Sequence, residues 1–220
     1  MDTTTLAQLL WNGLLETLFM TLVGTAISYL IGLPIGVSLI VTAPNGIKPA
    51  PVYNKVMGFI VNVIRSVPFL ILMIALMPYI RKIIGTGIGT PATTAALIVA
   101  AAPFVARMIE QSLLEVDPGV IEAAQAMGAS NMQIIRKVLL PEGRPSLLNG
   151  AAVATITILG YSAMAGAIGG GGLGDIAIRY GMYKFEPTIM WITVIILVVL
   201  VQLLQEIGIK VATKLDNRIS

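Results

Sequence analysis

Residues 117–141 read DPGVIEAAQAMGASNMQIIRKVLLP and separate two long apolar parts of the chain. Asp117 followed by Pro118 is typical of a helix start, because aspartate caps free backbone amides and proline loses no hydrogen bond at the first helical position. Gly128 is predicted to end this helix, since glycine adopts the left-handed conformation without a steric penalty. The helical period places four apolar residues on one face, and these are Val120, Ile121, Ala124 and Met127.

A second short helix is predicted directly after the first. Ser130 and Gln133 have the spacing of a capping box, and Pro141 is predicted to end the helix. Two short helices at a steep angle indicate a feature held outside the membrane for a partner protein to bind. Small residues would let such a helix enter a partner's groove, although alanine is also the strongest helix former. These small residues are Ala123, Ala124, Ala126, Gly128 and Ala129.

The composition is that of an integral membrane protein. Of 220 residues, 56% are hydrophobic and only 11% are charged, whereas a soluble domain carries roughly 25% charged residues. The absence of cysteine and histidine excludes disulfides, thiolate nucleophiles and the usual zinc or haem ligands. The net charge of +3 and scattered basic residues give no reason to expect nucleic acid binding. No lysine or arginine precedes Lys48, so we expect no cleavable signal peptide.

The apolar pattern predicts an all-α protein with five transmembrane helices per protomer. A helix needs about 20 residues to cross a hydrocarbon layer of about 30 Å. Thr5 and Gln8 have the spacing of a capping box, which predicts a short helix before the first span. Residues 206–220 are predicted to be a polar tail. The five spans are predicted at about residues 14–42, 56–80, 91–114, 147–168 and 188–204. Residues within the first span that are expected to permit close helix contact or a bend are Gly24, Gly32, Pro34 and Gly36.

The distribution of lysine and arginine predicts the topology. Five spans put the two chain ends on opposite sides of the membrane, and the side richer in lysine and arginine is cytoplasmic. One side would hold Lys48, Lys55, Arg107, Arg136, Lys137, Arg144, Lys210, Lys214 and Arg218, and the other Arg81, Lys82, Arg179 and Lys184. The N-terminus is therefore predicted to be periplasmic, and the C-terminus and residues 117–141 cytoplasmic.

Arg65 is a charge inside the second predicted span. Such a residue is usually functional or paired, because an unpaired charge in the membrane is unfavourable. Glu110 and Glu115 are candidate partners, but Arg65 could equally extend to the nearby headgroups. Arg107 and Glu110 have the spacing of an i,i+3 ion pair at the end of the third span.

Residues 160–175, GYSAMAGAIGGGGLGD, follow the fourth span. The glycines could form an unstructured outer loop. We favour the alternative that Tyr161, Ser162 and Met164 face a translocation path and that Met164 helps to close it, because methionine is flexible and apolar. The glycines are not a phosphate-binding loop, since no strand precedes them and no Lys-Ser/Thr follows.

Two parts of the sequence resemble a known family. Glu122-Ala123-Ala124, Gly128 and Val138-x-Leu140-Pro141 are similar to the EAA loop, EAA-x3-G-x9-I-x-L-P, of binding-protein-dependent ABC importer permeases, with Val138 replacing isoleucine. In that family the loop contains the coupling helix, which seats in a groove of a cytoplasmic ATPase subunit. The resemblance thus implies an ATPase-coupling role for Glu122, Ala123, Ala124, Gly128, Val138, Leu140 and Pro141.

Further motifs resemble the methionine importer permeases of this family, and with the five-span layout they cover nearly the whole chain. They are RSVPF at 65–69, APFVARM at 102–108, RKVLLPE at 136–142 and GYSAM at 160–164 followed by GGGGLGD. The resemblance implies one permease domain over residues 1–220 in a bacterial inner membrane. It also implies a homodimeric pore, two cytoplasmic ATPase subunits, a periplasmic methionine-binding (lipo)protein, and Met164 as the gate residue. The implied cargo is D- or L-methionine.

The energy source is predicted to lie outside this chain. The pattern G-x4-G-K-[ST] is absent, so ATP and magnesium would be bound by the ATPase, and this chain would be a non-catalytic subunit without a cofactor. Within the same class, the alternative is a permease for another amino acid or small polar solute. A stand-alone channel or secondary transporter is a weaker alternative. Proton- or ion-coupled carriers bury acidic residues or histidine at mid-membrane, whereas the acids of this chain are predicted at span ends or in loops. A non-transporting scaffold would not explain the patterned loop.

Overall fold

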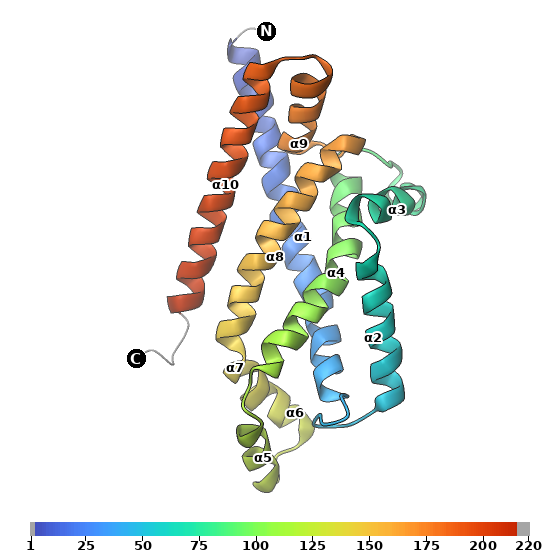
Figure 1. The fold of residues 1–220 in the computed structure, drawn as a ribbon, viewed down its shortest axis with the longest axis vertical. Coiled ribbons are helices and arrows are strands. Elements are labelled where there is room, and N and C mark those ends of the chain that lie inside the picture. Colours follow the sequence, from blue (N-terminus) through green and yellow to red (C-terminus); the bar gives the residue numbers. More distant parts are fainter. Residues whose placement is uncertain (1–2, 215–220) are drawn as a thin grey trace.

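The computed structural model describes residues 3–214, and this part of the chain contains helices and no strand (Figure 1). The all-α prediction is confirmed. Two segments, η1 and η3, are π-helical, and η2 is a 3-10 turn. The elements are α1 (Thr3–Val41), α2 (Pro51–Ser66), α3 (Phe69–Ile84), α4 (Thr90–Leu114), α5 (Pro118–Ala126), α6 (Asn131–Ile134), η1 (Ile135–Leu139), α7 (Leu140–Glu142), α8 (Arg144–Ala165), η2 (Gly166–Ile168), α9 (Gly172–Ile176), η3 (Ala177–Tyr183) and α10 (Pro187–Lys214).

The long helices run side by side along the longest dimension of the molecule (Figure 1). Within the described residues, four helical runs are long and apolar enough to cross a membrane: α1, α4, Arg144–Tyr183 and α10. A fifth span is present if α2 and α3, which form a bent pair, are taken together. Helices α5 and α6 lie at one end of the bundle, and α9 and the start of α1 lie at the other (Figure 1).

Helix α4 forms the centre of the bundle. Most of its side chains are small and buried, so α1, α3 and α8 pack closely around it. Gly32 and Gly36 of α1 allow this approach: a Cβ on Gly32 would lie 2.8 Å from Val105, and one on Gly36 would lie 2.5 Å from the Ala106 carbonyl oxygen. Val105 is itself completely buried. Close helix contact at these glycines, as predicted, is confirmed.

Two boundary predictions were wrong. The expected short helix at Thr5 is not separate, because α1 is one helix from Thr3 to Val41 that includes Pro34. Membrane helices tolerate proline where neighbouring groups accommodate it. Helix α10 continues to Lys214, ten residues past the predicted end at 204, and an ion pair between Lys210 and Glu206 lies on this extension. The rest of the predicted polar tail, including Arg218, lies outside the described residues.

Candidate functional site

The turn that joins α5 to α6 has the geometry that the sequence predicts. The Asp117 carboxylate accepts the Gly119 amide at 2.8 Å. Gly128 has φ +78°, in the left-handed region. Its amide donates to the Gln125 carbonyl at 2.9 Å, and the next amide, of Ala129, donates to the Ala124 carbonyl at 3.1 Å. These two bonds make a Schellman motif, which ends α5 and reverses the chain.

The second helix starts as predicted but does not end at Pro141. The Gln133 amide donates to the Ser130 hydroxyl, and the Gln133 side chain accepts the Ser130 amide at 2.8 Å, so the capping box is confirmed. From there the helical path continues to Glu142, with Pro141 inside it. The Leu140 amide reaches back five residues to the Ile135 carbonyl. The backbone is therefore already in the wider π-helical register when it reaches Pro141, which has no amide proton. This register relieves the clash between the proline ring and the preceding turn that normally ends a helix.

The predicted apolar face of the α5–α6 loop is partly buried and partly exposed. Ala124 is 4% exposed, and Ile134 and Leu139 are completely buried. Met127, predicted to lie on one face with Ala124, is 81% exposed, and Val120 is also exposed. The exposed face of α5 contains Glu122, Ala123, Ala126 and Met127, whereas Val138 and Leu140 are half-buried and Pro141 is exposed.

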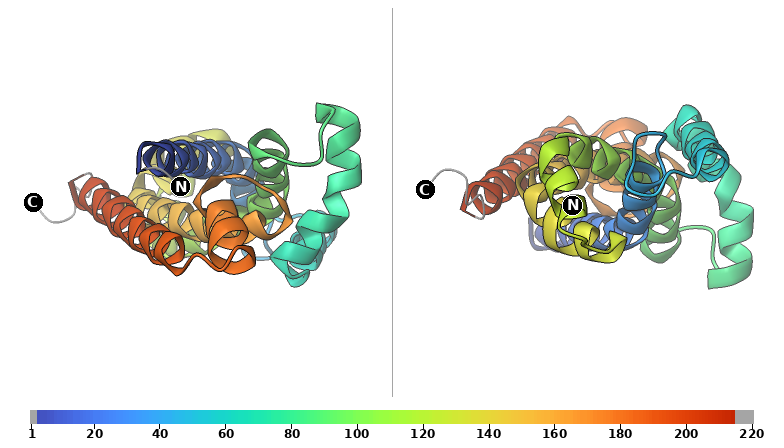
Figure 2. Two further views of the ribbon diagram at one scale, coloured as in Figure 1. Left: turned by 90° about the horizontal axis from the view of Figure 1, so that it is seen from above. Right: turned by 90° about the horizontal axis from the view of Figure 1, so that it is seen from below.

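The second predicted span is broken near its middle. Helices α2 and α3 meet at 103°. Val67 is extended, with ψ 127°, because a residue before proline is excluded from the helical region, and Pro68 starts α3. The span predicted at residues 56–80 is therefore a bent pair of helices. As a result α3 lies against the side of the bundle away from α10 (Figure 2).

The bend brings Arg65 and Tyr161 to one small cavity of about 250 Å³. The rings of Phe69 and Tyr161 stack in parallel, 4.1 Å apart between centroids and 6° between planes. No sequence pattern connects Arg65 with Tyr161, and none distinguishes Phe69 or Phe104 as site residues, although RSVPF and APFVARM contain them. The lining combines one cation with apolar and aromatic groups: Ile64, Arg65, Val67, Phe69, Leu72, Ala100, Phe104 and Tyr161.

Arg65 is exposed and does not take the partner proposed for it. Glu110 pairs with Arg107 at 2.5 Å, which confirms the i,i+3 pair, and Arg107 also donates to Asn62 at 2.9 Å. Within residues 3–214, Arg65 and Glu115 take part in none of the ion pairs. The guanidinium of Arg65 is thus open to the cavity and to solvent.

The three residues proposed for the translocation path occupy different environments. Met164 is 54% exposed, and Tyr161 is half-buried under Phe69. Ser162 is 1% exposed and donates its hydroxyl to the Leu159 carbonyl at 2.7 Å. Its side chain therefore faces the interior of the protomer and not the exposed surface that contains Met164.

The glycine-rich segment is folded against α1. The Glu16 carboxylate accepts the Gly172 amide at 2.6 Å, and the Thr17 hydroxyl accepts the Leu173 amide at 2.9 Å. These two α1 side chains cap the start of α9, which would otherwise have free amides. The unstructured-loop alternative does not describe this segment: Gly166, Gly172 and Gly174 are helical, and residues 169–171 form only a short connection between helices.

Sequence reasoning missed the acidic residues of this region. Glu16 lies inside α1, near the start of the first predicted span. Asp175 is 4% exposed and forms an ion pair with Arg179. An isolated glutamate in an apolar helix was the available signal.

Contact between α8 and α9 is backbone to backbone. A Cβ on Gly174 would lie 2.2 Å from the Ala163 carbonyl oxygen, and one on Gly166 would lie 2.3 Å from the Asp175 amide nitrogen. Such distances leave no room for any side chain, so glycine is required at both positions.

Comparison with known proteins is consistent with this arrangement of loop, bend and glycine-rich segment. The family described as the binding-protein-dependent transport system inner membrane component matches residues 29–207. The chain belongs to this family. It is therefore a permease component of a transport system and a multi-pass protein of an inner membrane.

Its relatives match over most or all of the chain. It is 48% identical over 96% of its length to the probable D-methionine transport system permease protein MetI of Vibrio cholerae serotype O1, covering 94% of that protein. It is 51% identical over 72% of its length to the D-methionine transport system permease protein MetI of Escherichia coli K12, covering 73% of that protein.

Solved structures agree with the fold. A chain of the MetNI methionine ABC transporter in an inward-facing conformation superposes with a TM-score of 0.96 at 46% identity, with 99% of this chain and 100% of that chain covered. A chain of an amino acid ABC transporter with histidines superposes with a TM-score of 0.72 at 24% identity, covering 99% of both chains, and this likeness concerns the fold alone.

Proposed function

We propose that this chain is the membrane-spanning subunit of an ATP-driven, binding-protein-dependent importer that carries D- or L-methionine. The observation that carries the proposal is the end-to-end match to permeases named for D-methionine transport, at 48% identity over 96% of the chain. Residues 1–220 would form one permease domain. Two copies would enclose the path between them, with two ATPase subunits on the cytoplasmic side and a methionine-binding lipoprotein on the periplasmic side.

The α5–α6 loop is the proposed contact with the ATPase. Three features support this role: a helix reversal fixed by two backbone hydrogen bonds, an exposed face of small residues, and an exposed methionine at its tip. Small residues let backbones approach closely, and methionine adapts to an apolar groove. ATP and magnesium would be bound by the partner, since this chain lacks G-x4-G-K-[ST]. The chain would thus act as a non-catalytic subunit.

The cavity at the Pro68 bend is the proposed point where the path contacts a passing amino acid. Arg65 would attract the carboxylate, and Phe69, Phe104 and Tyr161 would contact the apolar side chain. Met164, exposed on the same helix as Tyr161, would close the path. Substituting Arg65 with glutamine should raise the KM for uptake more than it lowers the maximal rate, whereas Arg65→Lys should retain part of the affinity.

The proposed orientation places the N-terminus in the periplasm and the C-terminus in the cytoplasm. The start of α1 and the end of α10 lie at opposite ends of the bundle, as an odd number of crossings requires (Figure 1). The lysine and arginine distribution gives the direction. Protease protection in sealed vesicles tests it: a cleavage site inserted after Gly128 should be cut from the cytoplasmic side only.

Uptake by reconstituted vesicles tests the function. Vesicles that contain the permease, the ATPase and the binding protein should accumulate labelled methionine only with internal ATP, and unlabelled methionine should compete better than other amino acids. Uptake without the ATPase would instead support a stand-alone carrier. ATP-dependent uptake of a different amino acid would retain the class and replace the substrate.

A further inference from the structure

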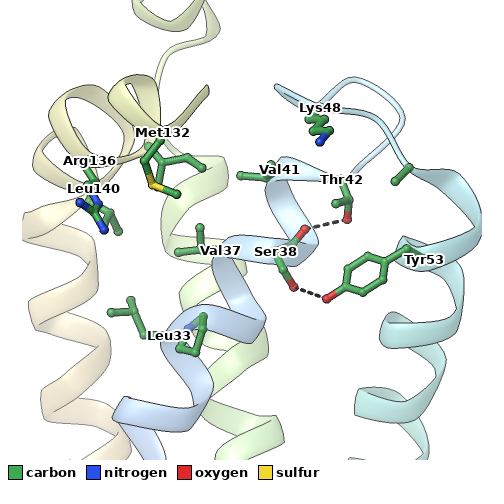
Figure 3. A pocket seen from close by; sticks show the side chains of 13 residues that line it. Leu33, Val37, Ser38, Val41, Thr42, Lys48, Tyr53, Met132, Arg136 and Leu140 are labelled. Carbon is green, nitrogen blue, oxygen red and sulfur yellow. Dashed lines mark hydrogen bonds between the residues drawn. The ribbon is translucent and has the colours of Figure 1, made fainter. Parts of the chain in front are cut away.

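An apolar groove beside the α5–α6 loop, on the α1 side, has no role in the proposed transport cycle. It has a volume of about 650 Å³ and lies between the last turns of α1, the start of α2 and the α6–η1 helix. Figure 3 shows the α1 side chains between Arg136 on one side and Tyr53 on the other. The apolar lining consists of Leu33, Pro34, Val37, Val41, Ile135 and Leu140.

The hydroxyl groups of the groove are already engaged by the protein. Tyr53 donates to the Ser38 hydroxyl at 3.2 Å, and Thr42 donates to the Ser38 carbonyl at 2.6 Å (Figure 3). Ser38 in turn donates to the Ile35 carbonyl at 2.7 Å. The groove therefore offers an occupant an apolar surface, with little capacity for neutral hydrogen bonding.

Two cations remain available at the groove. Lys48 and Arg136 both line it, both are exposed, and neither belongs to an ion pair within residues 3–214. They approach it from separate segments, the loop after α1 and the π-helix η1 (Figure 3). An occupant that satisfies this site has a negative group between the cations and an apolar chain along α1.

The position of the groove on a membrane-spanning helix favours a lipid as its occupant. Helix α1 has 39 residues, a length of about 58 Å at 1.5 Å per residue, so its last turns reach the headgroup region of a layer about 30 Å thick. Leu30, one turn before the groove on α1, is 74% exposed. An acyl chain of the surrounding membrane can therefore contact this part of α1. Basic pockets beside transmembrane helices bind anionic lipid headgroups.

We propose that this groove is a binding site for an anionic diacyl phospholipid. The phosphate lies between Lys48 and Arg136, and one acyl chain lies along Leu33, Val37 and Val41. The inference depends on the membrane placement of the chain and is independent of the transported solute and of the ATPase contact.

A lipid titration of the full-length permease in detergent tests the site. Native mass spectrometry would compare phosphatidylglycerol with zwitterionic phosphatidylcholine. Each cation near a charged lipid should contribute about fivefold, so the wild type should prefer phosphatidylglycerol by about thirtyfold. The double variant Lys48→Gln with Arg136→Gln should lose that preference and bind phosphatidylcholine as before. A matched control, Arg81→Gln with Lys82→Gln at the far end of α3, removes the same charge from another exposed pair and should keep the preference.

The proposal is overturned if the Lys48 and Arg136 double variant keeps the preference, or if the Arg81 and Lys82 control loses it equally. A second measurement locates the chain: phosphatidylglycerol with a photoreactive acyl group should label residues 33–41, and Val37→Trp, which fills the groove, should abolish that labelling. Uniform labelling of all exposed helices would also overturn the proposal. So would loss of the labelling on addition of the ATPase or on dimer formation, because the groove would then be a protein interface.

Discussion

Replacing Gly128 with alanine isolates the backbone geometry of the α5–α6 reversal. Gly128 has φ +78°, and a Cβ there would have nothing within 4 Å. The substitution therefore adds no clash and removes no contact, so its whole effect is the energy of a left-handed alanine, about 1–2 kcal/mol. That energy disfavours the native loop by a factor of about 5 to 30.

The proposed ATPase contact makes this strain measurable. If the ATPase binds only the native loop, Gly128→Ala should weaken the affinity between permease and ATPase by up to about 5- to 30-fold. Gly128→Asn should restore most of it, because asparagine tolerates the left-handed region. The assay is the dissociation constant for the ATPase, measured with the permease in nanodiscs, together with ATP-dependent uptake.

Gly85 is the control for this experiment. It has φ +89° and also has nothing within 4 Å of a Cβ, but it ends α3 and not α5. Gly85→Ala should strain the protein equally and leave ATPase affinity unchanged. Equal affinities for Gly128→Ala and Gly128→Asn, or an equal loss in Gly85→Ala, would refute the reasoning.

The remaining predictions concern the packing around the path. Gly174→Ala places a Cβ 2.2 Å from a backbone oxygen of α8 and should destabilise the protein by about 1–3 kcal/mol. Thermal unfolding measures this loss. The control is Gly160→Ala, which has nothing within 4 Å of its Cβ and should not lower the melting temperature. Glu16→Gln replaces a charged acceptor by a neutral one and should weaken the hydrogen bond to the Gly172 amide by about 1 kcal/mol. Hydrogen exchange at this amide should become faster, and unchanged exchange would contradict the capping role of Glu16. A double-mutant cycle of Phe69→Ala and Tyr161→Ala should give a coupling of about 0.5–1.5 kcal/mol for the stacked rings, and a coupling near zero would show that the stack contributes nothing.

Local signals in the sequence predicted the α5–α6 loop well. Ser130 with Gln133 and the single glycine at 128 each act within a few residues, so their geometry does not depend on the rest of the fold. The α4 boundaries also agree with prediction, because its apolar run starts and ends clearly. The exposure of Met127 could not be predicted, because helical period alone does not say whether an apolar residue contacts its own protein or a partner.

Hydropathy could not reveal the bend at Pro68. The residues on both sides are apolar, so the profile is continuous, and proline is often tolerated within a membrane helix. Only the tertiary structure, with Phe69 stacked on Tyr161, shows that α3 leaves the direction of α2. The same limit applies to Glu16, whose partner amide at Gly172 is 156 residues away in the sequence.

The glycine contacts between α8 and α9 have a mechanical consequence. Where backbone touches backbone there are no side chains to change rotamer, so the two surfaces cannot slide past each other in small steps. With Glu16 and Thr17 fastening α9 to α1, we expect these three helices to travel as one rigid block during a transport cycle. The part of the chain that bends during alternating access must then lie elsewhere, and we expect it to be the bend between α2 and α3.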